Sequence, residues 1–118
     1  MSLSEKLSNI EGLQYNEAIA RMCGDEELYR SALELSSQQI PSIIAELDGQ
    51  LDGGDMAGFA ISVHGLKGAL NTIGAVVLAG FADSLCKSAR SGDDGAVSEC
   101  WKEFRPQLES FVDKISTL

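Results

Sequence analysis

The stretch AVSECWKEFRPQLESFVDKI, residues 96–115, gives the clearest structural signal in the chain. Its large apolar residues recur in alternating steps of four and three, at Val97, Trp101, Phe104, Leu108, Phe111 and Ile115. This spacing places all six on one side of an α-helix, because one turn takes 3.6 residues. Pro106 lies inside the stretch and is expected to bend the helix slightly. A helix with one narrow apolar face must bury that face against other elements.

Residues 25–51 form a second long segment with helical spacing. Asp25 is placed to cap its N-terminus. Pro41 lies inside it, where we expect a kink or a local break. The apolar positions that we assign to its buried side are Leu28, Ala32, Leu35, Ile43, Ile44 and Leu47.

Two further segments, residues 55–72 and 76–90, have the same periodicity. A short helix over residues 16–23 comes first, and Gly24 suits its C-terminal end. The apolar positions are Met56, Phe59, Val63, Leu66 and Leu70 in residues 55–72, and Leu78, Phe81, Ala82, Leu85 and Ala89 in residues 76–90.

Short clusters of glycine and aspartate separate these segments, at residues 51–55, at Gly74 and at residues 91–95. Long helices with short connections favour antiparallel neighbours. No segment shows the alternation of a strand. The sequence therefore predicts an all-α fold, an up-down antiparallel four-helix bundle with a short extra N-terminal helix.

The length and charge of the chain limit its class. At 118 residues we expect a single domain over residues 1–118, with residues 1–11 as a flexible N-terminal segment. The net charge of −9 argues against a nucleic-acid partner, since such binding depends on Lys and Arg. No apolar run approaches the roughly 20 residues that span a bilayer, and no basic-then-apolar leader is present. We expect a cytoplasmic protein without membrane insertion, and a monomer, since the bundle leaves no large apolar face.

The three cysteines, Cys23, Cys86 and Cys100, are widely spaced and odd in number. No pair has the spacing of a zinc site or a redox motif. We therefore expect reduced and mostly packed thiols, as is usual in the cytoplasm.

The segment SVHGLKGALNTIG, residues 62–74, contains the only histidine, His64, and two glycines in a predicted helix. Each glycine costs about 1 kcal/mol relative to alanine in a helix interior. Rotation by 100° per residue places His64 roughly 130° from the apolar stripe, and Gly68 roughly 170° from it. The helix therefore presents an imidazole to solvent.

The surroundings of His64 on that outward side are small and flat. Ala57, Ile61 and Gly65 share this side, and Lys67 lies three residues on, within reach of the ring. Such a surface suits the docking of another protein better than the binding of a small molecule, which needs a concave pocket. A single histidine on a helix is most often an ordinary surface residue. Here a functional role is favoured by the combination of His64 with Lys67, two costly glycines and small neighbouring residues.

The run His64-Gly65-Leu66-Lys67-Gly68-Ala69, followed by Gly74, resembles the signature of the histidine phosphotransfer (HPt) domain family. In that family an H-x-x-K-G core lies on the second long helix of a four-helix bundle. The similarity extends over residues 12–115. Residues 24–29 resemble the family's entry into its first bundle helix, and residues 40–47 resemble the segment before the turn to the histidine helix.

The resemblance implies a phosphocarrier without a kinase domain of its own. His64 would take a phosphoryl group from the aspartate of one receiver domain and pass it to another. Lys67 would offset charge on the phosphoryl oxygens, and Gly68 would leave room for the partner. The receiver, in a hybrid sensor histidine kinase or a response regulator, would supply Mg²⁺, so we expect no cofactor or metal on this chain.

Further binding residues are expected around His64. They are Ala57, Ile61, Gly65, Asn71, Lys87 and Arg90. The two cations also suit a helix C-terminus for dipole reasons alone. Family members often have a glutamine on the next helix that holds the other ring nitrogen. The matching position here is Cys86, a poor hydrogen-bond partner, so a water or a backbone carbonyl is left as the alternative.

Three other functions are weaker alternatives. A helical interaction adaptor without phosphotransfer would be free to lose His64, Lys67 and Gly68, and all three are present. A kinase fragment would need a glycine-rich nucleotide loop, which the sequence lacks. A metal- or haem-binding bundle would need inward-facing histidines.

Overall fold

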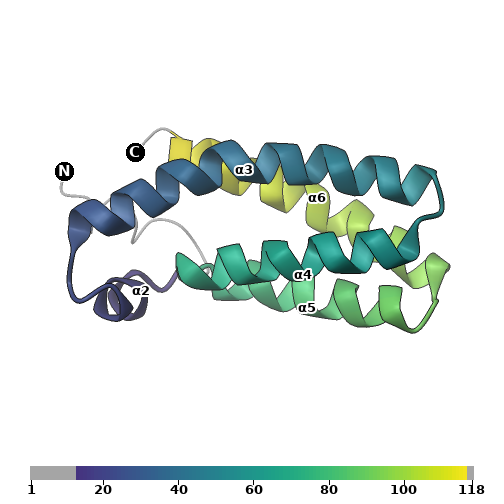
Figure 1. Ribbon diagram of the computed structural model, residues 1–118, viewed down its shortest axis with the longest axis horizontal. Helices are drawn as coiled ribbons and strands as arrows, with labels where there is room; N and C mark the ends of the chain where they lie inside the picture. Colours follow the sequence, from purple (N-terminus) through teal and green to yellow (C-terminus); the bar gives the residue numbers. More distant parts are fainter. Residues whose placement is uncertain (1–12, 117–118) are drawn as a thin grey trace.

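The computed structural model describes residues 13–116 and contains five α-helices in that range (Figure 1). The helices are α2 (Tyr15–Arg21), α3 (Glu26–Asp52), α4 (Met56–Thr72), α5 (Val76–Arg90) and α6 (Asp94–Ser116). The predicted all-α class is confirmed. The N-terminal segment predicted to be flexible, residues 1–11, lies outside the described residues.

The four long helices form an up-down bundle. Each packs against two neighbours, in the cyclic order α3, α4, α5, α6 and back to α3. Figure 1 shows α2 at the end of this bundle, beside the start of α3. Within residues 13–116 no helix is long and apolar enough to cross a bilayer.

The predicted apolar stripe of α6 forms one wall of the core. All six of its residues are buried. Trp101 packs edge-on against Phe59 of α4, with ring centroids 6.1 Å apart, and Phe104 stacks on Phe81 of α5 at 5.7 Å. These aromatic contacts join α6 to both helices of the opposite pair and contribute about 0.5–1.5 kcal/mol each beyond the area they bury.

The predicted stripe of α3 is wrong in its N-terminal half. Leu28 and Leu35 are 51% and 53% exposed. The buried face instead follows steps of four and three through Tyr29, Leu33, Ser36, Ile40, Ile44 and Leu47. The Tyr29 hydroxyl donates a hydrogen bond of 2.6 Å to the Ile73 carbonyl, which fixes this rotation of the helix. Tyr29 and Ser36, which carry hydroxyl groups, belong to this buried face, and a search for apolar side chains alone does not find them.

The two prolines do not interrupt their helices. α3 runs without a break through Pro41, and α6 runs through Pro106. The local break allowed for at Pro41 is therefore wrong. Both prolines are exposed, so their rings lie on the outer faces of the bundle.

Helix α2 ends at Arg21, earlier than predicted, and a short connection leads from it to α3. Cys23 and Gly24 follow with φ of 58° and 74°, and two successive left-handed residues end a helix. Cys23 is also exposed, whereas Cys86 is buried and Cys100 is partly buried, which agrees with the prediction of mostly packed thiols.

The turn between α4 and α5 is hydrogen-bonded to the segment just before α2. The Gln14 amide donates a 2.7 Å hydrogen bond to the Gly74 carbonyl. Gly74 has φ of 83°, and a Cβ on it would lie 2.6 Å from the Gln14 carbonyl oxygen. A glycine is required here because both the conformation and the close approach exclude a side chain.

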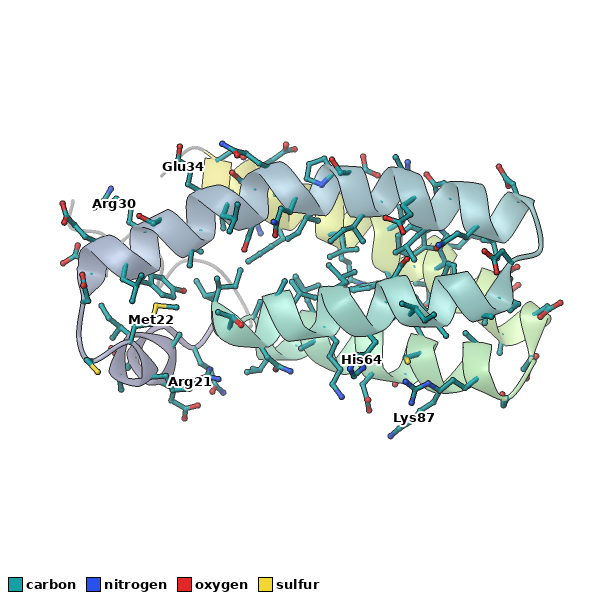
Figure 2. All side chains as sticks on the ribbon, viewed as in Figure 1. Arg21, Met22, Arg30, Glu34, His64 and Lys87 are labelled. Atoms are coloured by element: carbon teal, nitrogen blue, oxygen red, sulfur yellow. The ribbon has the colours of Figure 1, made fainter. Side chains whose placement is uncertain are left out.

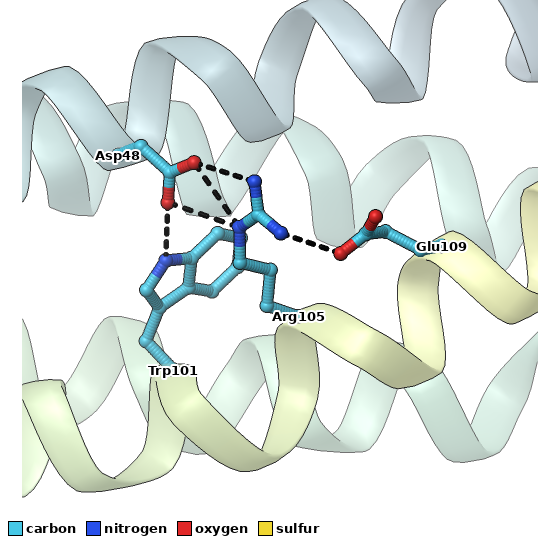
Figure 3. Close-up of polar contacts among 4 residues, drawn as sticks. All are labelled: Asp48, Trp101, Arg105 and Glu109. Atoms are coloured by element: carbon cyan, nitrogen blue, oxygen red, sulfur yellow. Dashed lines mark hydrogen bonds and ion pairs between the residues drawn. The ribbon is translucent and has the colours of Figure 1, made fainter.

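A polar cluster ties α3 to α6 across the surface of the bundle (Figure 3). Asp48 accepts hydrogen bonds from Trp101 Nε1 at 2.8 Å and from Arg105 Nε and Nη2 at 3.1 and 2.8 Å. Arg105 also pairs with Glu109 one turn further along α6. We call these four residues the Asp48 cluster. They fix the register of the two helices.

Candidate functional site

The rotation of α4 decides what its outer face presents. Asp55 caps the helix by accepting a 3.0 Å hydrogen bond from the Gly58 amide. The buried side of the helix consists of Phe59, Ala60, Val63, Leu66 and Leu70. His64 is exposed as a consequence, and Figure 2 shows its side chain at the lower edge of α4 in the view.

Small residues surround His64 on this face. Ala57, Ile61, Gly65 and Gly68 are all exposed, and Ile61 is 75% exposed. The five residues together are called the histidine patch below. Their outward position agrees with the rotation expected from the sequence.

The fold itself gives no reason for glycine at positions 65 and 68. A Cβ added to Gly65 or to Gly68 would meet no atom within 4 Å. Gly58 is different, because a Cβ there would lie 2.4 Å from the capping carboxylate of Asp55. The helix-propensity cost of Gly65 and Gly68, about 1 kcal/mol each, is therefore not offset by any contact within the described part of the chain.

A charged cluster lies next to the histidine patch, between α4 and α5. The carboxylate of Asp83 accepts a hydrogen bond from Lys67 Nζ at 2.9 Å and pairs with Lys87 Nζ at 3.0 Å. The side chains of Lys67 and Asp83 are only 34% and 35% exposed, whereas Lys87 is 77% exposed. We call these three residues the Asp83 cluster. It brings together the two lysines that the sequence placed near His64.

Asp83 itself was missed in the sequence analysis. Its spacing of four residues from Lys87 on one helix was the available signal. The hydrogen bond from Lys67, followed by that from Lys87, holds the pKa of Asp83 below its usual range. The carboxylate is therefore ionised at neutral pH, and each of its oxygens contacts one ammonium group.

The hydrogen bond of the Cys86 thiol is not directed to the imidazole. The thiol is buried and donates a weak hydrogen bond to the Ala60 carbonyl, with Sγ and O 3.6 Å apart. Ala60 lies one turn before His64 in α4. Within residues 13–116 no hydrogen bond reaches the His64 ring, so no hydrogen-bonding group of the described residues holds its second nitrogen.

Two other candidates lie away from this centre. Asn71 is two turns beyond His64 and partly buried, and its carbonyl accepts a 3.0 Å hydrogen bond from Arg21 Nη2. Arg90 is the exposed last residue of α5 and makes no ion pair with any other described residue. The structure does not bring either side chain into the Asp83 cluster, and their roles stay predictions.

Comparison with known families places the chain. The sequence model of the Hpt domain matches residues 20–117, which is most of the chain. The protein belongs to the Hpt domain family. This confirms the resemblance drawn from residues 64–69 and gives the class of function, a phosphocarrier module of histidine phosphotransfer. Searches of the curated proteins and of the solved structures gave no match.

Proposed function

We propose that this Hpt domain carries phosphoryl groups between receiver domains through His64. The observation that supports the proposal best is the histidine patch, where an exposed imidazole is followed by two glycines, Gly65 and Gly68, that the fold does not require. A surface kept free of side chains around a nucleophile leaves space for a second protein to approach it.

The chemistry follows from these groups. An unprotonated ring nitrogen of His64 attacks the phosphorus of an aspartyl phosphate, so that a P–N bond forms and the P–O bond to the aspartate breaks. The aspartate leaves as a carboxylate. In the onward step the carboxylate of a second receiver attacks the phosphorus, and the electron pair of the P–N bond returns to the ring.

Positive charge near the ring would stabilise the transferred group. Lys67 is one turn from His64, and phosphoryl transfer depends mainly on positioning and on such charges. We assign Gly68 the role of leaving room for the partner. In this proposal Mg²⁺ is supplied by the receiver domain.

The partners are receiver domains of a hybrid sensor histidine kinase or a response regulator. Docking would use the histidine patch, and we assign a peripheral part in it to Asn71, Lys87 and Arg90. We place the protein in the cytoplasm as a monomer, and assign this domain the role of a phosphocarrier. The free thiols are compatible with a reducing compartment.

One experiment tests this proposal directly. The protein is mixed with a receiver domain carrying labelled aspartyl phosphate, and label on this chain is followed through acid and base treatment. We expect label that is lost in acid and kept in base, and none on the His64→Gln variant. Absence of transfer to the wild type, or transfer that persists in His64→Gln, would contradict the proposal. Stable binding of the receiver without transfer would favour the adaptor alternative.

A further inference from the structure

Asp83 is the acidic member of the Asp83 cluster, and the transfer chemistry proposed above gives it no role. It lies on α5, whereas His64 and Lys67 lie on α4. Its carboxylate contacts both lysines near the histidine patch, at 2.9 and 3.0 Å. An anion in this position is unexpected beside a group that is to carry a phosphoryl dianion, because like charges at short range repel.

We propose that Asp83 is a positioning residue that holds the Lys67 ammonium and competes for it with the phosphoryl group on His64. The inference rests on the proposed function. In the unphosphorylated protein the ammonium is bound to the carboxylate. After transfer the same ammonium is shared between the carboxylate and the phosphoryl oxygens. Asp83 therefore weakens the retention of the phosphoryl group and favours its passage to the next receiver.

The burial of the three side chains identifies Lys67 as the lysine that Asp83 controls. Lys67 and Asp83 are both about two-thirds covered, so their contact is partly shielded from water. Lys87 is 77% exposed, and ion pairs of such exposed groups contribute little. Lys67 is also the lysine on the helix of His64, one turn away, where side chains three residues apart meet.

The chemistry of an ammonium group allows it to be shared between the two anions. Lysine has three donors on a flexible four-carbon stem, and it binds anions as a point charge rather than through a fixed fork. One donor is directed to Asp83, which leaves two for a phosphoryl oxygen without loss of the first contact. The lowered pKa of Asp83 keeps the competing carboxylate charged at neutral pH.

The test compares the wild type with Asp83→Asn, which keeps the shape of the side chain and removes its charge. The quantity measured is the equilibrium ratio of phosphohistidine on this chain to aspartyl phosphate on a receiver domain. We expect the variant to shift this ratio towards phosphohistidine by about threefold, since one like charge at the site is removed. An unchanged ratio, or a shift towards the receiver, would overturn the inference.

Two further variants separate positioning from a structural role. Asp48→Asn removes a comparable carboxylate from the α3–α6 side and should leave the ratio unchanged. When Asp83→Asn is added to Lys67→Met, the ratio should shift by much less than the threefold that Asp83→Asn gives in the wild type. The reason is that the ammonium group for which Asp83 competes is gone. An undiminished shift in the double variant would show that Asp83 does not act through Lys67.

A receiver-free measurement distinguishes failure of this inference from failure of the proposed function. His64 is phosphorylated chemically with phosphoramidate, and the phosphorus signal is titrated by ³¹P NMR. In Asp83→Asn the titration midpoint of the phosphoryl group should fall, because the two ammonium groups are no longer neutralised by the carboxylate. If the wild type accepts no phosphoryl group from any receiver, the proposed function fails. If the midpoint does not move in the variant, the inference about Asp83 fails.

Discussion

Two aspartates, Asp48 and Asp83, occupy similar places on opposite sides of the bundle and differ in their partners. Each lies on one long helix and binds a cation from the neighbouring one. Asp48 binds an indole N–H and an arginine fork, whereas Asp83 binds two lysine ammonium groups. Figure 3 shows the first arrangement, in which the carboxylate faces both the indole and the guanidinium.

The partners determine what each cluster does. The guanidinium of Arg105 is planar and the indole of Trp101 is rooted in the core, so the hydrogen bonds of Asp48 have a fixed geometry. Lysine ammonium groups exchange partners easily. The Asp48 cluster is therefore suited to holding helices in register. The Asp83 cluster is suited to changing its contacts when a negative charge is added at His64.

The largest effect is expected from Gly68→Gln, which fills the histidine patch without touching either cluster. Transfer to His64 should fall by about 100-fold, as expected for a misplaced reacting group. Stability should rise by about 0.5–1 kcal/mol, because glutamine replaces glycine in a helix interior where a Cβ meets nothing. Transfer assays and thermal unfolding measure the two quantities.

Gly49→Gln on α3 is the matched control for that variant. Gly49 is also exposed, with no atom within 4 Å of an added Cβ. Its substitution should raise stability without an effect on transfer. Equal transfer rates in the two variants would show that the histidine patch is not the docking surface.

The next largest effects are expected from removing one cation of each cluster, and the two variants should change different quantities. Lys67→Met should lower the rate of transfer by about tenfold, the equivalent of one charge-assisted hydrogen bond, with little change in stability. Arg105→Met should lower the free energy of unfolding by about 1–2 kcal/mol and leave transfer unchanged. Urea unfolding and transfer assays on both proteins decide the comparison. A stability loss in Lys67→Met as large as that in Arg105→Met would remove the distinction between the clusters.

A pH series sharpens the assignment of Asp48. The hydrogen bond from Arg105 lowers the pKa of Asp48 from its usual range. A lowered pKa means that the carboxylate stabilises the fold above its unfolded pKa, about 3.9, and that this contribution is lost as pH falls through the folded pKa. Asp48→Asn should therefore be less stable than the wild type by about 1 kcal/mol at neutral pH, with the partial exposure of the group taken into account.

The difference in unfolding free energy between the two proteins should stay constant down to about pH 5 and shrink below pH 4. Unfolding in urea across this range measures it. A difference that is independent of pH would mean that packing, and not the charge of Asp48, is responsible.

The smallest effect is expected from Lys87→Met. This lysine is 77% exposed, so its pair with Asp83 is weak and its charge is screened by water and salt. We expect a decrease of about twofold in transfer, which should disappear at high ionic strength. A loss as large as that of Lys67→Met would show that Asp83 positions both lysines equally.

The sequence was most informative where one physical pattern dominated. In α6 the six residues predicted to be buried are the six that are buried, because an uninterrupted apolar stripe leaves one way to pack the helix. The outward position of His64 followed in the same way from the stripe of α4. In α3 the pattern was mixed. Tyr29 enters the core because its hydroxyl finds the Ile73 carbonyl, a partner 44 residues away that no local spacing indicates.

The sequence by itself determined the class of fold, the boundaries of the long helices and the exposure of His64 and Gly68. These depend on local periodicity and on backbone preferences, which act within a few residues. Only the tertiary structure decided that Lys67 and Lys87 share Asp83 and that the Cys86 thiol faces the Ala60 carbonyl. It also decided that a Cβ added to Gly65 or Gly68 would meet no atom within 4 Å. Contacts between helices depend on how two faces are rotated and shifted against each other, and that is fixed by packing across the whole core.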